Sequence, residues 1–189
     1  MDLQFVLKEC PDLLKVVHKM VETHVSKDHD YAEKEPLGNL RASIDLGIEP
    51  WRGVMCRMGD KFHRIESLTA KGVAMVAESI EDAMLDLAIY TLICDILLDP
   101  EKPYQTYEQE ASRFIELVSM VIGIAENEIR VDGTPMNIPT AWNRLLLELS
   151  CNDTAWHVSY EQVSLYLMDL AVSCVLKLSD KSWPTAFLK

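Results

Sequence analysis

Glycine is scarce in this sequence, with 7 among 189 residues, and runs of β-branched residues are few. Long segments instead carry apolar residues at helical spacing, a pattern that predicts an all-α protein. Nearly half of the residues are hydrophobic, 49% in all, so the chain has enough material for a real core. At this length we expect one domain of ordinary size or two small halves.

Cysteine pairs at metal-ligand spacing are also absent. The five cysteines form no CxxC pair, and most of them lie within apolar helical patterns. We interpret them as reduced core residues of a cytoplasmic protein, because a zinc site or a disulfide framework would need paired spacing. The N-terminus has no basic-then-apolar signal pattern. The longest apolar run, 83–98, is interrupted by Asp86 and Asp95, so no membrane span is predicted.

Positive charge is in deficit, since the formal net charge is −12. Such a balance argues against binding to nucleic acid, whose phosphates would be repelled. A nucleotide ligand remains compatible with it, provided that a local basic patch or a metal ion offsets the charge of the phosphates.

The apolar periodicity and the breaks in it divide the chain into segments. The polar stretch 26–50 is broken by prolines and glycines and is predicted to be irregular. A proline-rich joint at 99–103 separates a first region, 1–100, from a second region, 101–189. The predicted helices are 11–25, 51–68, 73–98, 104–125, 140–149 and 159–178.

Four carboxylates stand in the segment that otherwise has the most buried character. Glu78, Asp82 and Asp86 are four residues apart and share one face of the predicted helix, with Glu81 beside them. Like charges at this spacing repel, and burying them is unfavourable unless something compensates. A divalent cation such as Mg²⁺ is the simplest compensator. The alternative is a polar stripe that faces water, flanked by lysines from elsewhere.

The preceding predicted helix carries a basic stripe, formed by Arg57, Lys61 and Arg64, with Asp60 at its edge. Its opposite side is apolar, at Val54, Met58, Phe62 and Ile65. The basic stripe is either a solvated helix face or a clamp for phosphate groups.

The two regions show a weak internal sequence similarity. Glu78 and Asp86-Leu87-Ala88 match Glu161 and Asp169-Leu170-Ala171 in spacing, and the segment 62–65 parallels 142–145. This similarity could mark a duplicated helical hairpin or a chance resemblance between amphipathic helices. The second copy has Leu165 where the first has Asp82.

The segment 57–65 followed by 78–90 resembles the nucleotide modification associated domain 1 family of phages and bacteria. That family is similar to the MazG-like all-α nucleoside triphosphate pyrophosphohydrolases. The resemblance covers roughly residues 27–98. It implies that 1–100 is a MazG-like nucleotide-binding helical bundle, with 101–189 as additional helices packed on it.

The resemblance also implies an activity: cleavage of a (deoxy)nucleoside triphosphate to a monophosphate and pyrophosphate with Mg²⁺ or Mn²⁺. The family's acidic motifs are only partly kept, because Ser79 replaces a glutamate and Lys61 and Arg64 stand at acidic positions. The implied roles are metal ligation by Asp60, Glu78, Asp82 and Asp86, general base catalysis by Glu78 or Glu81, phosphate binding by Arg57, Lys61 and Arg64, and base binding by Tyr31, Asn39 and Trp51.

Two other functions stay open at this point. The protein could bind or sequester a nucleotide without cleaving it, or it could be a helical protein-interaction module whose charges serve solubility. A homo-oligomer is expected from the resemblance, and the host cytoplasm is the expected location if the chain is phage-encoded.

Overall fold

Almost all of the described structure is helical. The computed structural model of the protein describes residues 11–31, 36–71, 79–99, 106–130, 137–150 and 159–180, and no strand occurs among them. The prediction of an all-α fold is therefore confirmed. The elements are α2 (Pro11–Tyr31), α3 (Gly38–Arg41), the 3₁₀ helix η1 (Ala42–Leu46), α4 (Pro50–Lys71), α5 (Ile80–Leu98), α6 (Tyr107–Arg130), α7 (Ile138–Ser150) and α8 (Tyr160–Ser179).

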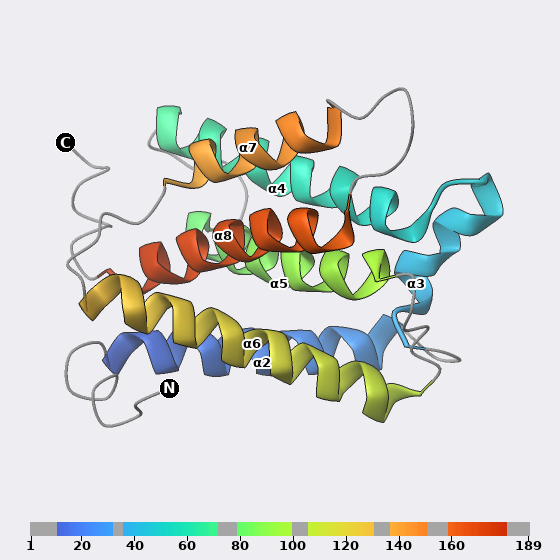
Figure 1. Ribbon diagram of the computed structural model, residues 1–189, viewed down its shortest axis with the longest axis horizontal. Coiled ribbons are helices and arrows are strands. Elements are labelled where there is room, and N and C mark those ends of the chain that lie inside the picture. Colours follow the sequence, from blue (N-terminus) through green and yellow to red (C-terminus); the bar gives the residue numbers. More distant parts are fainter. Residues whose placement is uncertain are drawn as a thin grey trace.

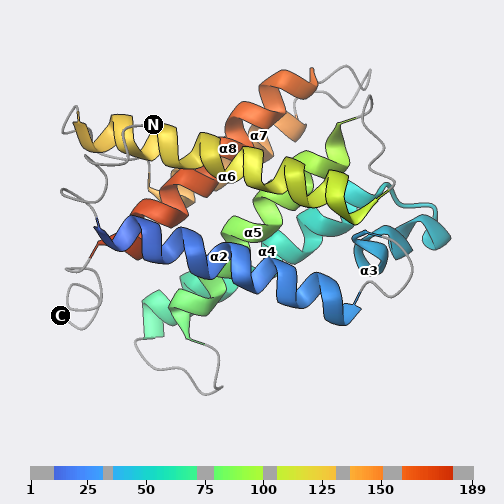
Figure 2. The same cartoon turned by 90° about the horizontal axis from the view of Figure 1, so that it is seen from below.

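The long helices stack in layers. In Figure 1, α4 and α7 lie together at the top, α5 and α8 in the middle, and α2 and α6 at the bottom. Figure 2, seen from below, keeps the same order, with α2 and α6 nearest the viewer. The middle layer packs on both of the others, since α5 contacts α4, α2 and α6, and α8 contacts α7, α2 and α6.

Helix α5 is the central element because most of its residues are apolar and buried. It starts at an N-cap, Ser79, whose hydroxyl accepts a hydrogen bond from the backbone N–H of Asp82. It ends at Leu98, just before Asp99-Pro100, where proline cannot continue a helix. Buried residues follow one another from Ala83 to Ile96 with breaks only at Asp86 and Tyr90, so this part of the helix is covered on every side.

The outer layer of α4 and α7 is joined by an aromatic stack. The rings of Phe62 on α4 and Trp142 on α7 lie 5.1 Å apart, at an interplanar angle of 19°. Gly59, one turn before Phe62, also faces the indole, and a Cβ atom there would lie 3.8 Å from it, an ordinary van der Waals contact. The predicted apolar face of α4 is confirmed, since Val54, Met58, Phe62 and Ile65 are all buried.

The prediction of an irregular segment over 26–50 is wrong in two places. Helix α2 continues to Tyr31, and Gly38–Leu46 forms α3 and η1. The end of α2 was missed because its residues are polar and carry no apolar period. The short helices are held by Leu37 and Leu40, which are buried, and η1 stops at Gly47, which has a φ of 70°.

Helix α8 is the one helix in the described part of the chain that is long and apolar enough to cross a membrane. It meets this criterion by its length and composition only. Over half of its apolar stretch, 56%, is buried inside the protein, and it lies in the middle layer against α5. A core helix has the same properties.

The aromatic stack between α4 and α7 leads to a stability prediction. Replacing Trp142, which is 4% exposed, with alanine should lower the free energy of unfolding by about 3–5 kcal/mol, because a large cavity forms between the helices. Urea denaturation measures this. The control is Leu147→Ala on the same helix, 63% exposed, which should change stability by no more than about 0.5 kcal/mol. Equal losses in both variants would contradict the packing described above.

Candidate functional site

Asp86 lies at the centre of a lysine cluster. Its side chain, on α5, is 13% exposed and stands among buried neighbours. Lys61 on α4 places its Nζ 2.9 Å from one carboxylate oxygen, and Lys27 on α2 contacts the other oxygen within hydrogen-bonding distance. A largely buried carboxylate requires compensation, and two ammonium groups from separate helices supply it here. We call Lys27, Lys61 and Asp86 the lysine–aspartate cluster.

Asp82, one turn earlier on α5, has a different set of partners. Its carboxylate accepts hydrogen bonds from the backbone N–H and the hydroxyl of Ser79, and Lys19 on α2 lies 3.4 Å away. Burial alone would raise the pKa of Asp82, but the hydrogen bonds from Ser79 and the ammonium of Lys19 outweigh it and lower that pKa. This carboxylate caps a helix, and the N-terminal end of the helix dipole favours its charge.

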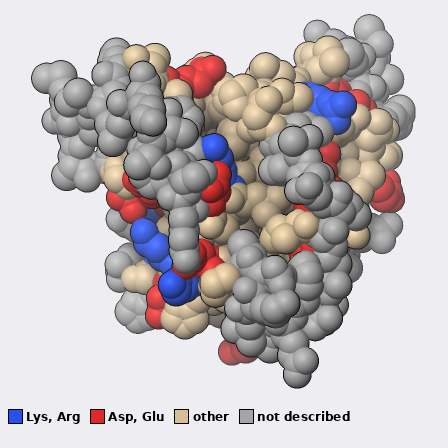
Figure 3. All heavy atoms as spheres, turned by 90° about the vertical axis from the view of Figure 1, so that its left-hand side faces the viewer, with Lys and Arg blue, Asp and Glu red and all other residues tan. Residues whose placement is uncertain are grey.

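Figure 3 shows the end of the molecule at which α5 begins. Among the described residues on this face, lysine and arginine side chains lie beside aspartate and glutamate side chains, and charges of one sign do not form a separate patch. Two members of the acidic stripe predicted from the sequence, Asp82 and Asp86, are paired with lysines from neighbouring helices. This arrangement matches the alternative in which lysines from elsewhere flank the stripe.

The described carboxylates do not form a metal site as they stand. Asp82 and Asp86 are engaged by Ser79 and by lysines, and Asp60 on α4 is exposed. Among the residues that the structure describes, no group of three His, Cys, Asp or Glu side chains is placed to hold a metal ion. Glu78, the fourth predicted ligand and a candidate base, lies outside these residues, so Mg²⁺ or Mn²⁺ ligation stays a prediction.

The other predicted site residues are spread over several elements. Glu81 is partly buried in the first turn of α5, and Arg57 on α4 is exposed. Arg64, two turns along α4 from Arg57, is partly buried. The basic stripe is thus divided, since Lys61 turns to Asp86 while Arg57 faces solvent.

The residues predicted to bind a base lie on three different helices, and the structure does not bring the described ones together. Trp51, at the start of α4, is partly buried and has the guanidinium of Arg52 5.2 Å from its ring centroid. Asn39 on α3 is exposed. Tyr31 ends α2, and its side chain lies outside the described part of the chain. Base recognition by these residues stays a prediction.

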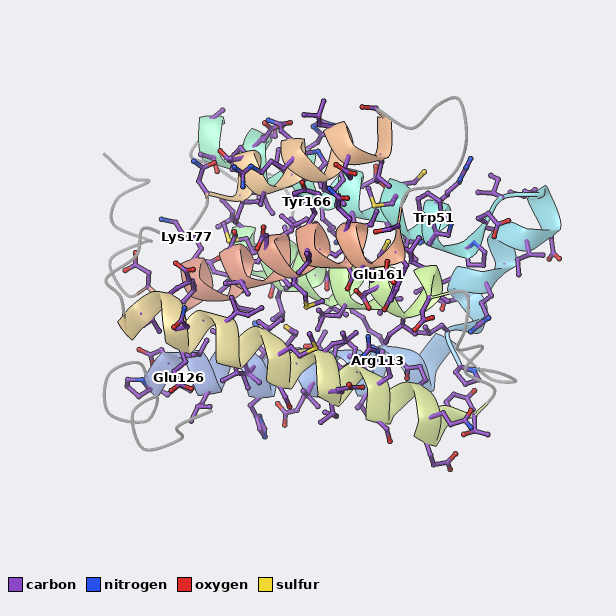
Figure 4. The ribbon with its side chains drawn as sticks, in the orientation of Figure 1. Trp51, Arg113, Glu126, Glu161, Tyr166 and Lys177 are labelled. Carbon is purple, nitrogen blue, oxygen red and sulfur yellow. The ribbon has the colours of Figure 1, made fainter. Side chains whose placement is uncertain are left out.

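A second polar cluster, which the sequence did not indicate as a unit, surrounds Asp95 on α5. This carboxylate is fully buried and accepts hydrogen bonds from Ser164 and, at 3.0 Å, from Tyr160, both on α8. The guanidinium of Arg113 on α6, labelled in Figure 4, donates to Asp95 at 3.4 Å and to Tyr160 at 3.2 Å. Burial, then the charge of Asp95 and the hydrogen bond to it, raise the pKa of Tyr160 to about 12.

The cluster of Asp95, Arg113, Tyr160 and Ser164 joins α5, α6 and α8. The one signal for it in the sequence was an aspartate that interrupts an apolar run, because its partners are distant along the chain. Its groups largely satisfy one another, which is typical of a structural network.

A third polar pair lies between α2 and α6. His24 and Glu110 are both buried, and His24 Nε2 lies 3.0 Å from a carboxylate oxygen of Glu110. The imidazole also stacks on Phe114, with the ring centroids 3.9 Å apart. This pair ties the bottom layer of the protein together.

In comparisons with known proteins, the chain matches no protein family, no curated protein and no solved structure. Function must therefore be argued from the clusters themselves.

The N-cap of α5 gives a pH-dependent prediction. Ser79→Ala should lower the free energy of unfolding by about 1 kcal/mol and bring the pKa of Asp82 back toward its ordinary value. A carboxyl group with a lowered folded-state pKa stabilises the protein above its unfolded-state pKa. That contribution is lost as the pH falls through the folded-state value. The wild type should therefore lose stability below about pH 4, and the variant should lose less.

Denaturation midpoints measured across acidic pH test this prediction. Ser159→Ala is the matched control, because Ser159 caps α8 in the same way by accepting from the backbone N–H of Gln162. Ser159→Ala should remove a similar cap without changing how the stability falls at acidic pH. If both variants lose stability equally at acidic pH, the pKa of Asp82 does not depend on the hydrogen bond from Ser79.

Disrupting the buried cluster around Asp95 should destabilise the protein more than removing the N-cap of α5. Asp95→Ala should lower the free energy of unfolding by about 3 kcal/mol, because the guanidinium of Arg113 stays largely buried without its interior counter-charge. Tyr160→Phe, which removes one hydrogen bond, should cost about 1 kcal/mol. Urea denaturation of both variants measures these values. A near-neutral Asp95→Ala would mean that the network contributes little to joining α5, α6 and α8.

Proposed function

We propose that the protein binds the phosphate groups of a nucleotide at the face formed by α2, α4 and α5. The observation that carries the proposal is the lysine–aspartate cluster, in which two ammonium groups converge on one carboxylate. Lys27 and Lys61 come from separate helices, so their positions are fixed by packing. Two ammonium groups at one carboxylate bring N–H donors from two helices together at this face, in a protein whose net charge is −12.

The side chains of the cluster are accessible to a ligand. Lys27 is 42% exposed and Lys61 is 22% exposed, whereas Asp86 is only 13% exposed. The carboxylate thus lies beneath the two ammonium groups, which it orients toward each other. An anionic phosphate group approaching from solvent would meet the lysines first and could share their N–H donors with Asp86.

The resemblance to the nucleotide modification associated domain 1 and MazG-like families supports the choice of a nucleotide among phosphate ligands. It also makes pyrophosphohydrolysis the reaction to assay. The described carboxylates do not provide a metal site, so we derive no metal-dependent step, and nucleotide binding is the function that the geometry supports best. Lys61 would neutralise the charge on a bound phosphate directly, in place of one metal ion.

Isothermal titration calorimetry with a panel of ribo- and deoxynucleoside triphosphates tests the binding. Lys27→Gln/Lys61→Gln should weaken the best ligand about tenfold or more, because two charge-assisted hydrogen bonds are lost. The control is Lys15→Gln, also on α2, whose ammonium pairs with Asp12. It should bind as the wild type does, and all variants are first checked for a wild-type circular dichroism spectrum.

Two results would overturn the proposal: no binding of any nucleotide by the folded wild type, or equal affinity in the double variant and the control. Chromatography of the same mixtures with Mg²⁺ or Mn²⁺ added reports whether a monophosphate and pyrophosphate are formed. Their formation would extend the function to hydrolysis.

A protein-interaction role is the second candidate, and a specific observation favours it. Three large aliphatic side chains in and just after η1 face solvent: Ile44 is 55% exposed, Leu46 78% and Ile48 42%. Exposed apolar residues that gather in one place are typical of interaction sites. This candidate gains support if the folded protein binds no nucleotide.

A further inference from the structure

The outer helices α2 and α6 bury the same register of residues. A shift of 101 residues takes the four buried residues in the described part of α2 onto buried residues of α6, although the identities differ. The corresponding buried residues are Leu13 and Phe114, Val17 and Val118, Met20 and Val121, and His24 and Ala125. The two helices also lie side by side in the bottom layer and contact each other (Figure 2).

Helices α4 and α7 correspond in the same way. A shift of 80 residues takes the buried Met58, Phe62 and Ile65 onto the buried Ile138, Trp142 and Leu145. Phe62 and Trp142, which correspond to each other, are also the two rings that stack. Corresponding residues touch each other where a two-fold axis passes between them, so the stack marks such an axis.

Helices α5 and α8 complete the set, with a shift of 83 residues. The buried residues 84, 85 and 87–89 of α5 fall on the buried residues 167, 168 and 170–172 of α8, and in each helix one partly buried aspartate interrupts the run. The interrupting residues are Asp86 and Asp169, which correspond under this shift. The helices run antiparallel, since Asp95 near the end of α5 contacts Ser164 and Tyr160 near the start of α8.

We infer that residues 11–99 and 106–180 are two copies of one unit of three long helices, paired about an approximate two-fold axis. The order of helices is the same in both, α2, α4, α5 and then α6, α7, α8. Each layer in Figure 1 holds one helix from each unit, and the two are always corresponding helices. Chance similarity of amphipathic helices would explain a shared register, but it would not place every corresponding pair in the same layer.

The partner of the first unit is therefore the second unit of the same chain. It covers the apolar surface of α5 as a second copy would in an isologous dimer. The homo-oligomer expected from the sequence is not needed to complete this core.

The two units have diverged at the polar position on the middle layer. Where Asp86 has Lys27 and Lys61, the corresponding positions around Asp169 hold Glu128 and Ala141. Burial raises the pKa of Asp169; Arg144 opposes this rise, and Glu128 adds to it. The described part of the chain thus contains one lysine–aspartate cluster, in the first unit, because the second unit has neither lysine at the corresponding positions.

An exchange of the stacked rings tests the two-fold relation. Phe62→Trp and Trp142→Phe should each lower the melting temperature, and the double exchange should restore most of the loss, because the two pockets are built from corresponding positions. The comparison is His24→Phe/Phe114→His, an exchange within a stacked pair whose positions do not correspond. It should stay destabilised. The inference would be overturned if the double exchange of Phe62 and Trp142 lowered the melting temperature by as much as the two single variants together.

A transferred lysine gives a second test, which depends on the residue correspondence itself. Ala141→Lys places a lysine at the position that corresponds to Lys61, so its ammonium should reach Asp169 and lower the pKa of that carboxyl relative to the wild type. Thr140→Lys, one residue earlier and exposed, carries the same charge and should not. Nuclear magnetic resonance titration of the Asp169 carboxyl carbon measures both.

Equal titration of Asp169 in the two lysine variants would mean that positions 61 and 141 do not correspond, and the inference would fail. If Ala141→Lys does not fold, the exchange of Phe62 and Trp142 decides by itself. Neither test uses nucleotide binding, so the result is independent of the proposed function.

Discussion

The burial of α5 on all sides is the constraint on which the rest of the structure depends. A helix whose middle, from Ala83 to Ile96, is largely apolar must be covered by neighbours there, and α4, α8, α2 and α6 provide that cover. Any ionisable group on such a helix is removed from water, so it must find partners on the covering helices. Asp86 and Asp95 meet this requirement at different depths, and their partners lie on different helices.

The surroundings of the two aspartates differ in exposure, and therefore in whether a ligand can reach them. Asp95 is fully enclosed, with Tyr160, Ser164 and Arg113 around it, and this arrangement holds three helices in one register. Asp86 lies nearer the surface and is reached by lysines that remain partly in water. A buried, satisfied network favours a structural role, whereas solvent-accessible ammonium groups favour contact with an anion. The difference in exposure is the reason that the proposed function is placed at Asp86.

The approximate two-fold axis explains how a chain of this length encloses so apolar a helix. Two similar helices, α5 and α8, cover each other, and the flanking pairs then cover the outer surfaces. In the sequence this relation is visible only as a weak similarity around Asp86 and Asp169 and between 62–65 and 142–145, because the copies share few identical residues. The pattern of buried positions shows it more clearly, since burial constrains the spacing of apolar residues and leaves their identities free to vary.

The sequence by itself determined the helical class, the buried face of α4 and the extent of most helices, because apolar periodicity is a local property that each helix carries along its own length. It also located the acidic positions of α5. It failed over 26–50, where polar residues at the end of α2 gave no periodic signal. Only the tertiary structure decided which charges meet. Lys27 and Asp86, or Arg113 and Asp95, are distant along the chain, and their pairing follows from how the helices stack, which no local pattern encodes.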